Sequence, residues 1–242
     1  MSTETVLHPV YGLTTFLQND KYIGHWVREK VIWEEYLTKF FHKYVRPGTN
    51  VIDVGAFIGL HSLYLTRRCV TAGNLVYAFE PQPVLYKILK ENIKANALDT
   101  RIQAFPMALS GTSGLVKMAV PKDYDQWENP GGLGFVDDQF QNDQLKSIQV
   151  VMMPLDAFQL KNISLMKIDV EGQELQMLCG AKETIARERP VLIVELMGGE
   201  DREEARQQIQ DRIAWIESTF GYKLQHNINH DYVFSPTENG SR

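Results

Sequence analysis

Cysteine is scarce in this sequence. Only Cys69 and Cys179 occur, and neither belongs to a Cys-x-x-Cys pair or to a cysteine–histidine cluster with the spacing of a zinc site. The pattern favours two reduced thiols that pack as small hydrophobic side chains, and it predicts no metal centre of that kind.

The chain also lacks an excess of positive charge and long hydrophobic runs. It has 25 basic and 30 acidic residues, a net charge of −5 and no basic run, which argues against sequence-independent binding to nucleic acid. No apolar run approaches the roughly 20 residues that span a bilayer. Residues 1–20 lack the basic and apolar regions of a signal peptide. We therefore expect a cytoplasmic protein without a membrane span.

What the sequence does contain is typical of a globular α/β protein. Apolar residues make up 44% and charged residues 23% of the 242 positions. Short apolar runs alternate with amphipathic helical patterns from residue 50 onward, which predicts a mostly parallel, doubly wound sheet with helices on both faces. The expected strands are 50–54, 75–79, 102–105, 115–120, 148–152, 165–169 and 191–195, and a helix is expected over 174–186. Residues 222–225 and 232–234 are expected to form a terminal antiparallel hairpin.

Two further segments complete the expected organisation. Residues 1–49 contain the spacing of one helix face from Trp33 to Tyr44, and they are interpreted as an N-terminal helical cap on a domain that covers 50–242. Within that domain, 121–146 is a polar, glycine-containing loop excursion. Its aromatic residues, Tyr124, Trp127 and Phe135, offer flat apolar faces and are candidates for contact with a bound ligand. A purely solvated surface loop is the alternative.

The strongest chemical signal lies between the first two strands of the sheet. Asp53 precedes a turn that contains Gly55, Ala56 and Gly59, and Glu80 ends the next strand. A strand that enters a glycine turn and then a helix lets a nucleotide approach the backbone, and a carboxylate at the end of the second strand accepts hydrogen bonds from ribose hydroxyls.

The spacing favours S-adenosyl-L-methionine over a dinucleotide. A dinucleotide site has the pattern G-x-G-x-x-G, whereas this chain has D-x-G-x-x-x-G. Asp53 would repel a pyrophosphate but attract a cofactor that carries a sulfonium and an ammonium group. A dehydrogenase site and a turn used only for packing remain the alternatives.

The catalytic candidates follow a later buried strand. Asp169 and Glu171 lie at its carboxyl end, where open α/β sheets bind ligands, and Lys167 lies on the same strand face as Asp169. Asp169 is the expected general base near the transferred methyl group, supported by Glu171 or Glu174.

Several other interpretations of these residues stay open. The charged residues could form a purely structural network. Asp169 with Glu195 or Glu171 could hold a divalent cation, although no spacing is diagnostic and no metal is predicted. His61 and His230 are alternative bases.

Five segments resemble the FkbM family of class I S-adenosylmethionine-dependent methyltransferases: Asp53–Gly59, Phe79–Pro81, Ala108–Ser110, Leu155–Phe158 and above all Lys167–Glu174. The similarity covers about residues 50–195, and Phe57 stands where the family typically has Asn. The resemblance implies a seven-stranded sheet whose last strand is antiparallel. It also implies O-methylation of a hydroxyl on a sugar or secondary metabolite.

The resemblance further implies roles for individual residues. Asp53, Gly55 and Gly59 would line the methionine end of the cofactor, Glu80 would hold the ribose, and Ala108 with Leu109 would flank the adenine. Rhizobial members that methylate the 2-hydroxyl of a fucosyl group on a nodulation factor have about this size, so a glycan or glycolipid is the expected acceptor. An acceptor from secondary metabolism and a binding module without turnover remain alternatives.

Overall fold

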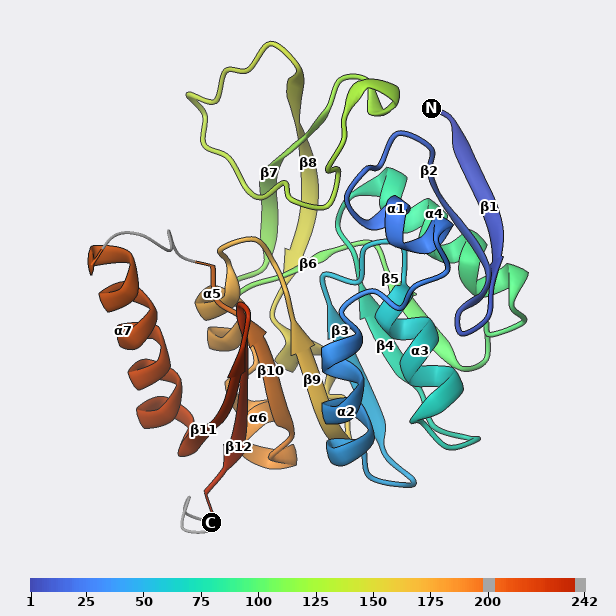
Figure 1. Ribbon diagram of the computed structural model, residues 1–242. Coiled ribbons are helices and arrows are strands. Elements are labelled where there is room, and N and C mark those ends of the chain that lie inside the picture. The colour runs from blue at the N-terminus through green and yellow to red at the C-terminus, as the bar shows by residue number, and fades with distance from the viewer. Residues whose placement is uncertain (198–202, 238–242) are drawn as a thin grey trace.

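The computed structural model describes residues 1–197 and 203–237, and its centre is a seven-stranded sheet (Figure 1). The strand order is β11 (Tyr222–Ile228), β12 (Asp231–Pro236), β10 (Val191–Glu195), β9 (Ile163–Ile168), β3 (Asn50–Val54), β4 (Val76–Phe79) and β5 (Ile102–Phe105). All neighbouring pairs from β10 to β5 are parallel, and β12 pairs antiparallel with both β10 and β11. The predicted fold class, including the antiparallel last strand and the terminal hairpin, is confirmed.

Hydrophobic cores on both faces hold the sheet between two layers of helices. Side chains alternate along each strand, so Val51 belongs to one core and its neighbour Ile52 to the other. The first core contains residues from α2 (Glu35–Tyr44), α3 (Leu60–Arg68) and α4 (Pro83–Ala95). The second contains residues from α5 (Glu174–Cys179), α6 (Lys182–Glu188) and α7 (Glu203–Phe220). Two-sided burial explains why the central strands are apolar at nearly every position.

One expected helix is divided in two. The sequence pattern predicts a continuous helix over 174–186, but the structure ends α5 at Cys179 and starts α6 at Lys182. At Gly180 between them, a Cβ atom would lie 2.0 Å from the carbonyl oxygen of Ser110. The chain therefore bends where only glycine allows two backbone segments to come this close.

The N-terminal segment is not only helical. Its β1 (Thr3–His8) and β2 (Gly12–Leu17) form an antiparallel hairpin, followed by α1 (Ile23–Arg28) and α2. Sequence patterning did not indicate this hairpin. The hairpin lies against α4 (Figure 1), where the side chain of Asn92 bonds both the amide and the carbonyl of Thr15, at 2.6 and 2.9 Å.

The strands predicted at 115–120 and 148–152, which flank the loop excursion, are confirmed. β6 (Ala108–Leu109), β7 (Gly114–Pro121) and β8 (Leu145–Met153) form a second sheet in the order β6-β8-β7, and β7 and β8 project away from the central sheet (Figure 1). Residues 122–144 join β7 to β8 and include the short 3-10 helix η1 (Tyr124–Gln126). A second, η2 (Leu155–Phe158), precedes β9. Across residues 1–197 and 203–237, no helix combines the length and hydrophobicity needed to cross a membrane.

Candidate active site

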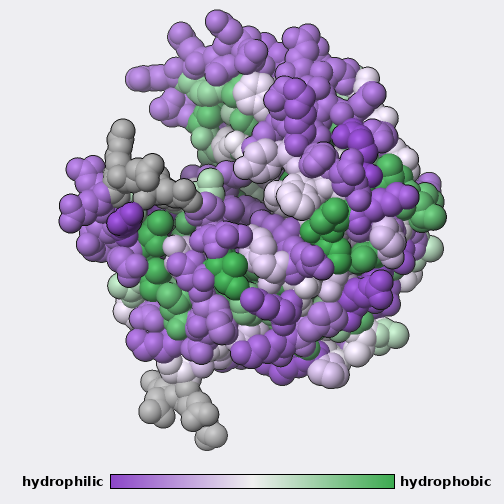
Figure 2. All heavy atoms as spheres, viewed as in Figure 1, coloured by the Kyte–Doolittle hydropathy of each residue, from purple (hydrophilic) through white to green (hydrophobic). Residues whose placement is uncertain are grey.

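A cavity of about 900 Å³ opens at the carboxyl ends of the parallel strands. Its floor is formed by residues that directly follow four strands: Gly55 after β3, Glu80 after β4, Asp169 after β9, and Glu195 at the end of β10. Residues of the N-terminal segment and of the loop between β7 and β8 form its other walls. Figure 2 shows the molecule hollowed on this side, below the projecting β7–β8 hairpin. The volume lies in the range of small-molecule and cofactor sites.

Gly55 has the conformation that the glycine turn requires. Its φ is +78°, and a Cβ atom would lie 1.7 Å from the carbonyl oxygen of Asp169. The backbone amides of Gly55 and Ala56 donate to the carbonyl of Phe79 at 3.0 and 2.9 Å, which joins the turn to the end of β4. Only glycine fits between this turn and the backbone of Asp169, and Gly55 itself lines the cavity.

Three other predicted cofactor residues lie behind the cavity wall. Asp53 is 1% exposed, and one of its oxygens accepts a 2.6 Å hydrogen bond from Ser62, while Oδ1 has no partner. Gly59 precedes α3 with φ +94°, and a Cβ atom there would meet Leu89 at 2.5 Å. Ala56 is buried and likewise does not line the cavity. These residues shape the turn, and direct contact with a cofactor stays a prediction for them.

Glu80 is a buried carboxylate at the cavity wall. Its two oxygens accept hydrogen bonds from the backbone amides of Phe57 and Gln82, at 2.9 and 2.8 Å. Burial, reinforced by the negative charges of Asp169 and Asp53, raises the pKa of Glu80 to about 7. Each carboxylate oxygen retains a second lone pair, so Glu80 can still accept hydrogen bonds from two neighbouring hydroxyls.

The adjoining part of the cavity suits a flat apolar ring. Ala108 and Leu109 are buried in β6 and line the cavity together with Phe79 and Met107. Phe79 is fixed by Phe105, whose ring stacks on it at 4.8 Å between centroids. An apolar slot beside a buried carboxylate and a glycine turn fits the adenosine portion of S-adenosylmethionine.

An ion pair between Lys167 and Asp169 lies at the other half of the cavity. The Nζ atom of Lys167 lies 2.8 Å from Oδ2 of Asp169, and the Lys167 side chain is only 2% exposed. Although burial opposes charging, the carboxylates of Asp169, Glu34, Asp53 and Asp231 hold the pKa of Lys167 well above its usual range. The Asp169 side chain is 28% exposed, and although its partial burial opposes ionisation, the positive charge of Lys167 lowers the pKa of Asp169. Asp169 lines the cavity whereas Lys167 does not, so Lys167 reaches the cavity only through its contact with Asp169.

Two further carboxyl groups surround Asp169. Burial, with the charge of Asp169 and a hydrogen bond to it, raises the pKa of Glu195 to about 10, so Glu195 carries a proton at neutral pH. Burial and the charge of Asp169 also raise the pKa of Glu171 to about 7. Glu171 lines the cavity with a left-handed backbone, φ +51°. Glu174 lies outside the cavity wall, where its carboxylate accepts a 2.7 Å hydrogen bond from the amide of Gly172.

Glu34 is a cavity residue that sequence reasoning missed. It directly precedes α2 with φ +47° and ψ +47°, a conformation that costs a non-glycine residue about 1–2 kcal/mol. Its Oε2 lies 2.9 Å from Nε2 of His61. The positive charge of Lys167 and the hydrogen bond to His61 offset its burial and keep the pKa of Glu34 below its usual value. No local sequence pattern marks Glu34, because its partners come from α3 and β9.

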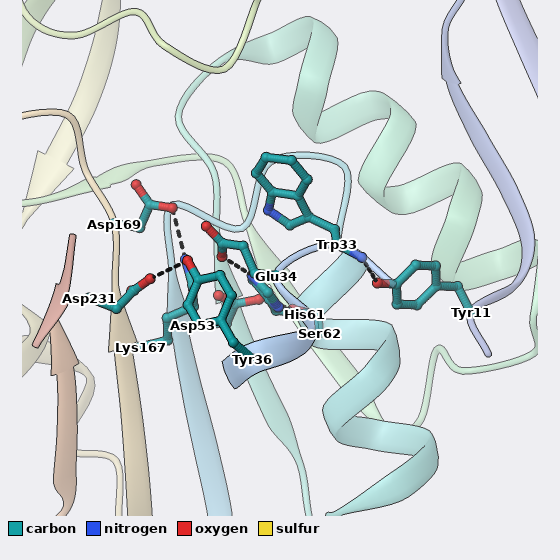
Figure 3. Close-up of polar contacts among 10 residues, drawn as sticks. All are labelled: Tyr11, Trp33, Glu34, Tyr36, Asp53, His61, Ser62, Lys167, Asp169 and Asp231. Atoms are coloured by element: carbon teal, nitrogen blue, oxygen red, sulfur yellow. Dashed lines mark hydrogen bonds and ion pairs between the residues drawn. The ribbon is translucent and has the colours of Figure 1, made fainter. Parts of the chain in front are cut away.

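Figure 3 shows how the N-terminal segment meets the sheet at this point. Tyr36, the second residue of α2, donates a 2.8 Å hydrogen bond from its hydroxyl to Asp231, at the start of β12. Asp231 pairs with Glu195 across the antiparallel strands. The carboxyl ends of β9 and β10, the start of β12 and the beginning of α2 thus meet around one lysine.

The remaining sequence candidates divide between the cavity and its surroundings. His230 lines the cavity, whereas His61 lies behind Glu34. Of the three loop aromatics, Phe135 lines the cavity, while Tyr124 donates to the side chain of Gln82 at 3.1 Å and Trp127 donates to the carbonyl of Asn129 at 2.9 Å. Within the described part of the chain, no group of three or more histidine, cysteine, aspartate or glutamate residues is arranged to hold a metal ion.

Comparison with known proteins decides the family. A model described as the methyltransferase FkbM domain matches residues 53–224. This chain belongs to the FkbM methyltransferase family. Members of the family use S-adenosyl-L-methionine, so the predicted cofactor is confirmed and agrees with the fit of the cavity.

Individual relatives agree with this assignment. Methyltransferase sdnD of Sordaria araneosa is 28% identical over 184 residues, which are 65% of this chain and 70% of the relative. The crystal structure of Methyltransferase FkbM from Methylobacillus flagellatus KT has a TM-score of 0.51 and 17% identity, and the match covers 81% of this chain. At that identity the likeness shows the fold, and this chain spans only 50% of that protein.

Proposed function

We propose that this methyltransferase transfers a methyl group to a hydroxyl oxygen of a carbohydrate. The observation that carries the proposal is the composition of one continuous cavity. Glu80 and an apolar slot lie at one end, and the carboxyl groups of Asp169, Glu171 and Glu195 lie at the other. When bound, S-adenosylmethionine supplies a methyl group already activated by a positively charged sulfur.

Transfer to a hydroxyl requires a group that accepts its proton. Asp169 is our candidate for this task, because it lines the cavity and the positive charge of Lys167, 2.8 Å away, favours its ionised form. Glu195, whose pKa burial and the charge of Asp169 raise to about 10, donates its proton to Asp169, and this hydrogen bond favours the ionised form of Asp169. Glu171, with a pKa of about 7, is the second candidate base, since its pKa is matched to neutral pH.

A sugar acceptor suits the rest of the cavity. Aromatic residues from the N-terminal segment and Phe135 from the β7–β8 loop line its wall together with Asn129, Gln173 and Asn229. A sugar ring has one apolar face and a rim of hydroxyl groups, and it is held by this mixture of flat rings and amide groups. The surplus of carboxyl groups disfavours a phosphorylated acceptor.

The 2-hydroxyl of a fucosyl group on a nodulation factor is the first specific acceptor to test. Purified protein would be incubated with S-adenosylmethionine and a panel of glycans that includes fucosylated chitooligosaccharides, and products would be analysed by mass spectrometry. We expect a mass gain of one methyl group on at least one glycan. Methylation of secondary metabolites but of no glycan would contradict the carbohydrate proposal.

A binding module without turnover is the remaining alternative. Calorimetric titration with S-adenosylhomocysteine separates it from the enzyme. Binding of this ligand without methylation of any hydroxyl compound would contradict the proposed activity while leaving the cofactor site in place.

A further inference from the structure

Exposed apolar side chains gather around the mouth of the cavity. Among the residues that the structure describes, nine large hydrophobic side chains are exposed, and four of them line this cavity: Tyr22, Trp26, Val31 and Met197. We call these four residues the mouth patch. Its two aromatic members are Tyr22, 60% exposed, and Trp26, 42% exposed, which come from the N-terminal segment around α1. Apolar surface concentrated at a cavity entrance marks a binding surface.

The aromatic rings of the mouth patch are held in place from behind. Trp33 lies 6.1 Å from Trp26 in an edge-on arrangement and 6.2 Å from Tyr22 between ring centroids. The backbone amide of Trp33 donates to the buried hydroxyl of Tyr11 at 2.9 Å (Figure 3). The aromatic rings of the mouth patch are therefore preorganised, which reduces the entropy lost on binding a ligand.

The start of α1 is fixed as well. Oδ1 of Asp20, a 1% exposed residue, accepts hydrogen bonds from the amides of Tyr22 and Ile23, both at 2.9 Å. Lys21 forms an ion pair with Glu128 of the β7–β8 loop, and the amide of Lys21 donates to the Glu128 carbonyl at 3.0 Å. The segment that carries Tyr22 and Trp26 is thus joined to the second wall of the cavity.

Polar groups accompany the aromatic ones. Asn129 and Asn229 line the same cavity, and Glu34 and Glu35 follow Trp33 along its wall. A lipid chain would gain nothing from these groups, whereas a sugar ring uses both the flat faces and the hydrogen-bonding groups. The patch lies at the mouth, while Asp169 lies on the floor, so a ligand that contacts both has to extend beyond a single ring.

We propose that Trp26 and Tyr22 form an acceptor subsite that stacks on a sugar ring of an oligosaccharide, next to the ring that is methylated. The subsite rests on the proposed carbohydrate methylation and adds that the acceptor is an oligosaccharide and not a free monosaccharide. The mouth patch then determines acceptor length, while the floor determines which hydroxyl reacts.

The test compares a fucosylated chitooligosaccharide with methyl α-L-fucoside as acceptors. We expect Trp26→Ala to raise the KM of the oligosaccharide about 10-fold, the loss typical of one stacked ring, with kcat little changed. The KM of the monosaccharide and the affinity for S-adenosylhomocysteine should stay the same. Trp26→Phe should restore most of the oligosaccharide affinity. Leu115→Ala is the matched control, because Leu115 is 61% exposed on β7 and does not line the cavity.

Binding is measured independently of turnover, by saturation-transfer NMR of the oligosaccharide in the presence of S-adenosylhomocysteine. Oligosaccharide bound through Trp26 but never methylated would contradict the proposed function and retain the subsite. Methylation of the oligosaccharide with an unchanged KM in Trp26→Ala would overturn the subsite alone. Failure of the wild-type protein to bind any oligosaccharide, or binding that follows only the length of an attached alkyl chain, would also overturn it.

Discussion

The two ends of the cavity are built in different ways. The end that we propose for the nucleotide consists of residues close to the ends of neighbouring parallel strands: Gly55 directly after β3, Glu80 directly after β4, and the pair Ala108–Leu109 of β6 shortly after β5. The acceptor end combines Glu34 and the mouth patch from the N-terminal segment with Asp169, Glu195 and Asn229. Local strand–turn–helix units create the first end, while the second exists only after segments from the whole chain have packed together.

The two ends of the cavity also differ in their electrostatics. At the nucleotide end, Glu80 stands among backbone amides and apolar side chains. At the acceptor end, several carboxyl groups interact with the positive charge of the buried Lys167. Changes at the nucleotide end should therefore alter cofactor affinity, whereas changes at the acceptor end should alter turnover. Four substitutions test this separation.

Asp169→Asn should have the largest effect. Because the amide cannot accept the hydroxyl proton as the carboxylate does, we expect kcat to fall by about 10²–10⁴-fold. Calorimetry should show an almost unchanged affinity for S-adenosylhomocysteine. Asp99→Asn, at an exposed position, serves as the control, and thermal unfolding shows whether Lys167 without its partner still permits folding. Equal losses of turnover and cofactor affinity would place Asp169 at the nucleotide end.

Gly55→Ala should have the second largest effect, for a steric reason. The added Cβ would collide with the carbonyl of Asp169, so we expect the free energy of unfolding to fall by about 3 kcal/mol and cofactor binding to be lost. Gly48→Ala is a matched control, since Gly48 also has a positive φ, +76°, but nothing within 4 Å of the added atom. The free energy of unfolding of the Gly48→Ala variant should fall by only about 1 kcal/mol. Urea denaturation of both variants measures the difference, and similar losses would mean that backbone strain alone matters.

Glu80→Gln should weaken S-adenosylhomocysteine binding by about 10–100-fold, because hydrogen bonds to a charged group contribute about 1.5–3 kcal/mol. In the wild-type protein, the pKa of about 7 means that affinity should rise as the pH increases from 6 to 8 and the carboxyl ionises. Calorimetry across this pH range should show that Glu80→Gln removes the dependence. Glu171→Gln is the control, because the ligand lacks the sulfonium charge that Glu171 could attract. A pH dependence that disappears in Glu171→Gln and persists in Glu80→Gln would refute the assignment.

Glu34→Gln should have the smallest effect. The amide keeps the shape of the side chain but removes a negative charge near Lys167 and alters the contact with His61. We expect kcat to fall about 10-fold, on the order of one lost charge-assisted hydrogen bond, with cofactor affinity unchanged. Glu29→Gln, exposed at the end of α1, is the control. A loss of cofactor affinity would show that the two ends are not separable.

The outcome of the sequence predictions follows the same division. The strands, the two-sided burial, the cofactor and the positions of Gly55, Glu80 and Asp169 in one cavity could be predicted, because each depends on short patterns and on the rule that parallel strands end at one edge. The division of the helix at Gly180 could not, since it depends on the distant Ser110. The cavity position of Glu34 escaped for the same reason, and the hairpin of residues 3–17 lies against α4, where the distant Asn92 bonds Thr15.

By itself, the sequence determined the alternation of strands and helices, the glycine turn and the carboxylates that end individual strands, because these arise from interactions between residues close in the chain. The tertiary structure alone decided that Glu34 and Trp26 join Asp169 in one cavity, and that Glu195 keeps a proton beside it. The physical reason is that burial and the approach of like charges depend on segments that lie far apart along the chain.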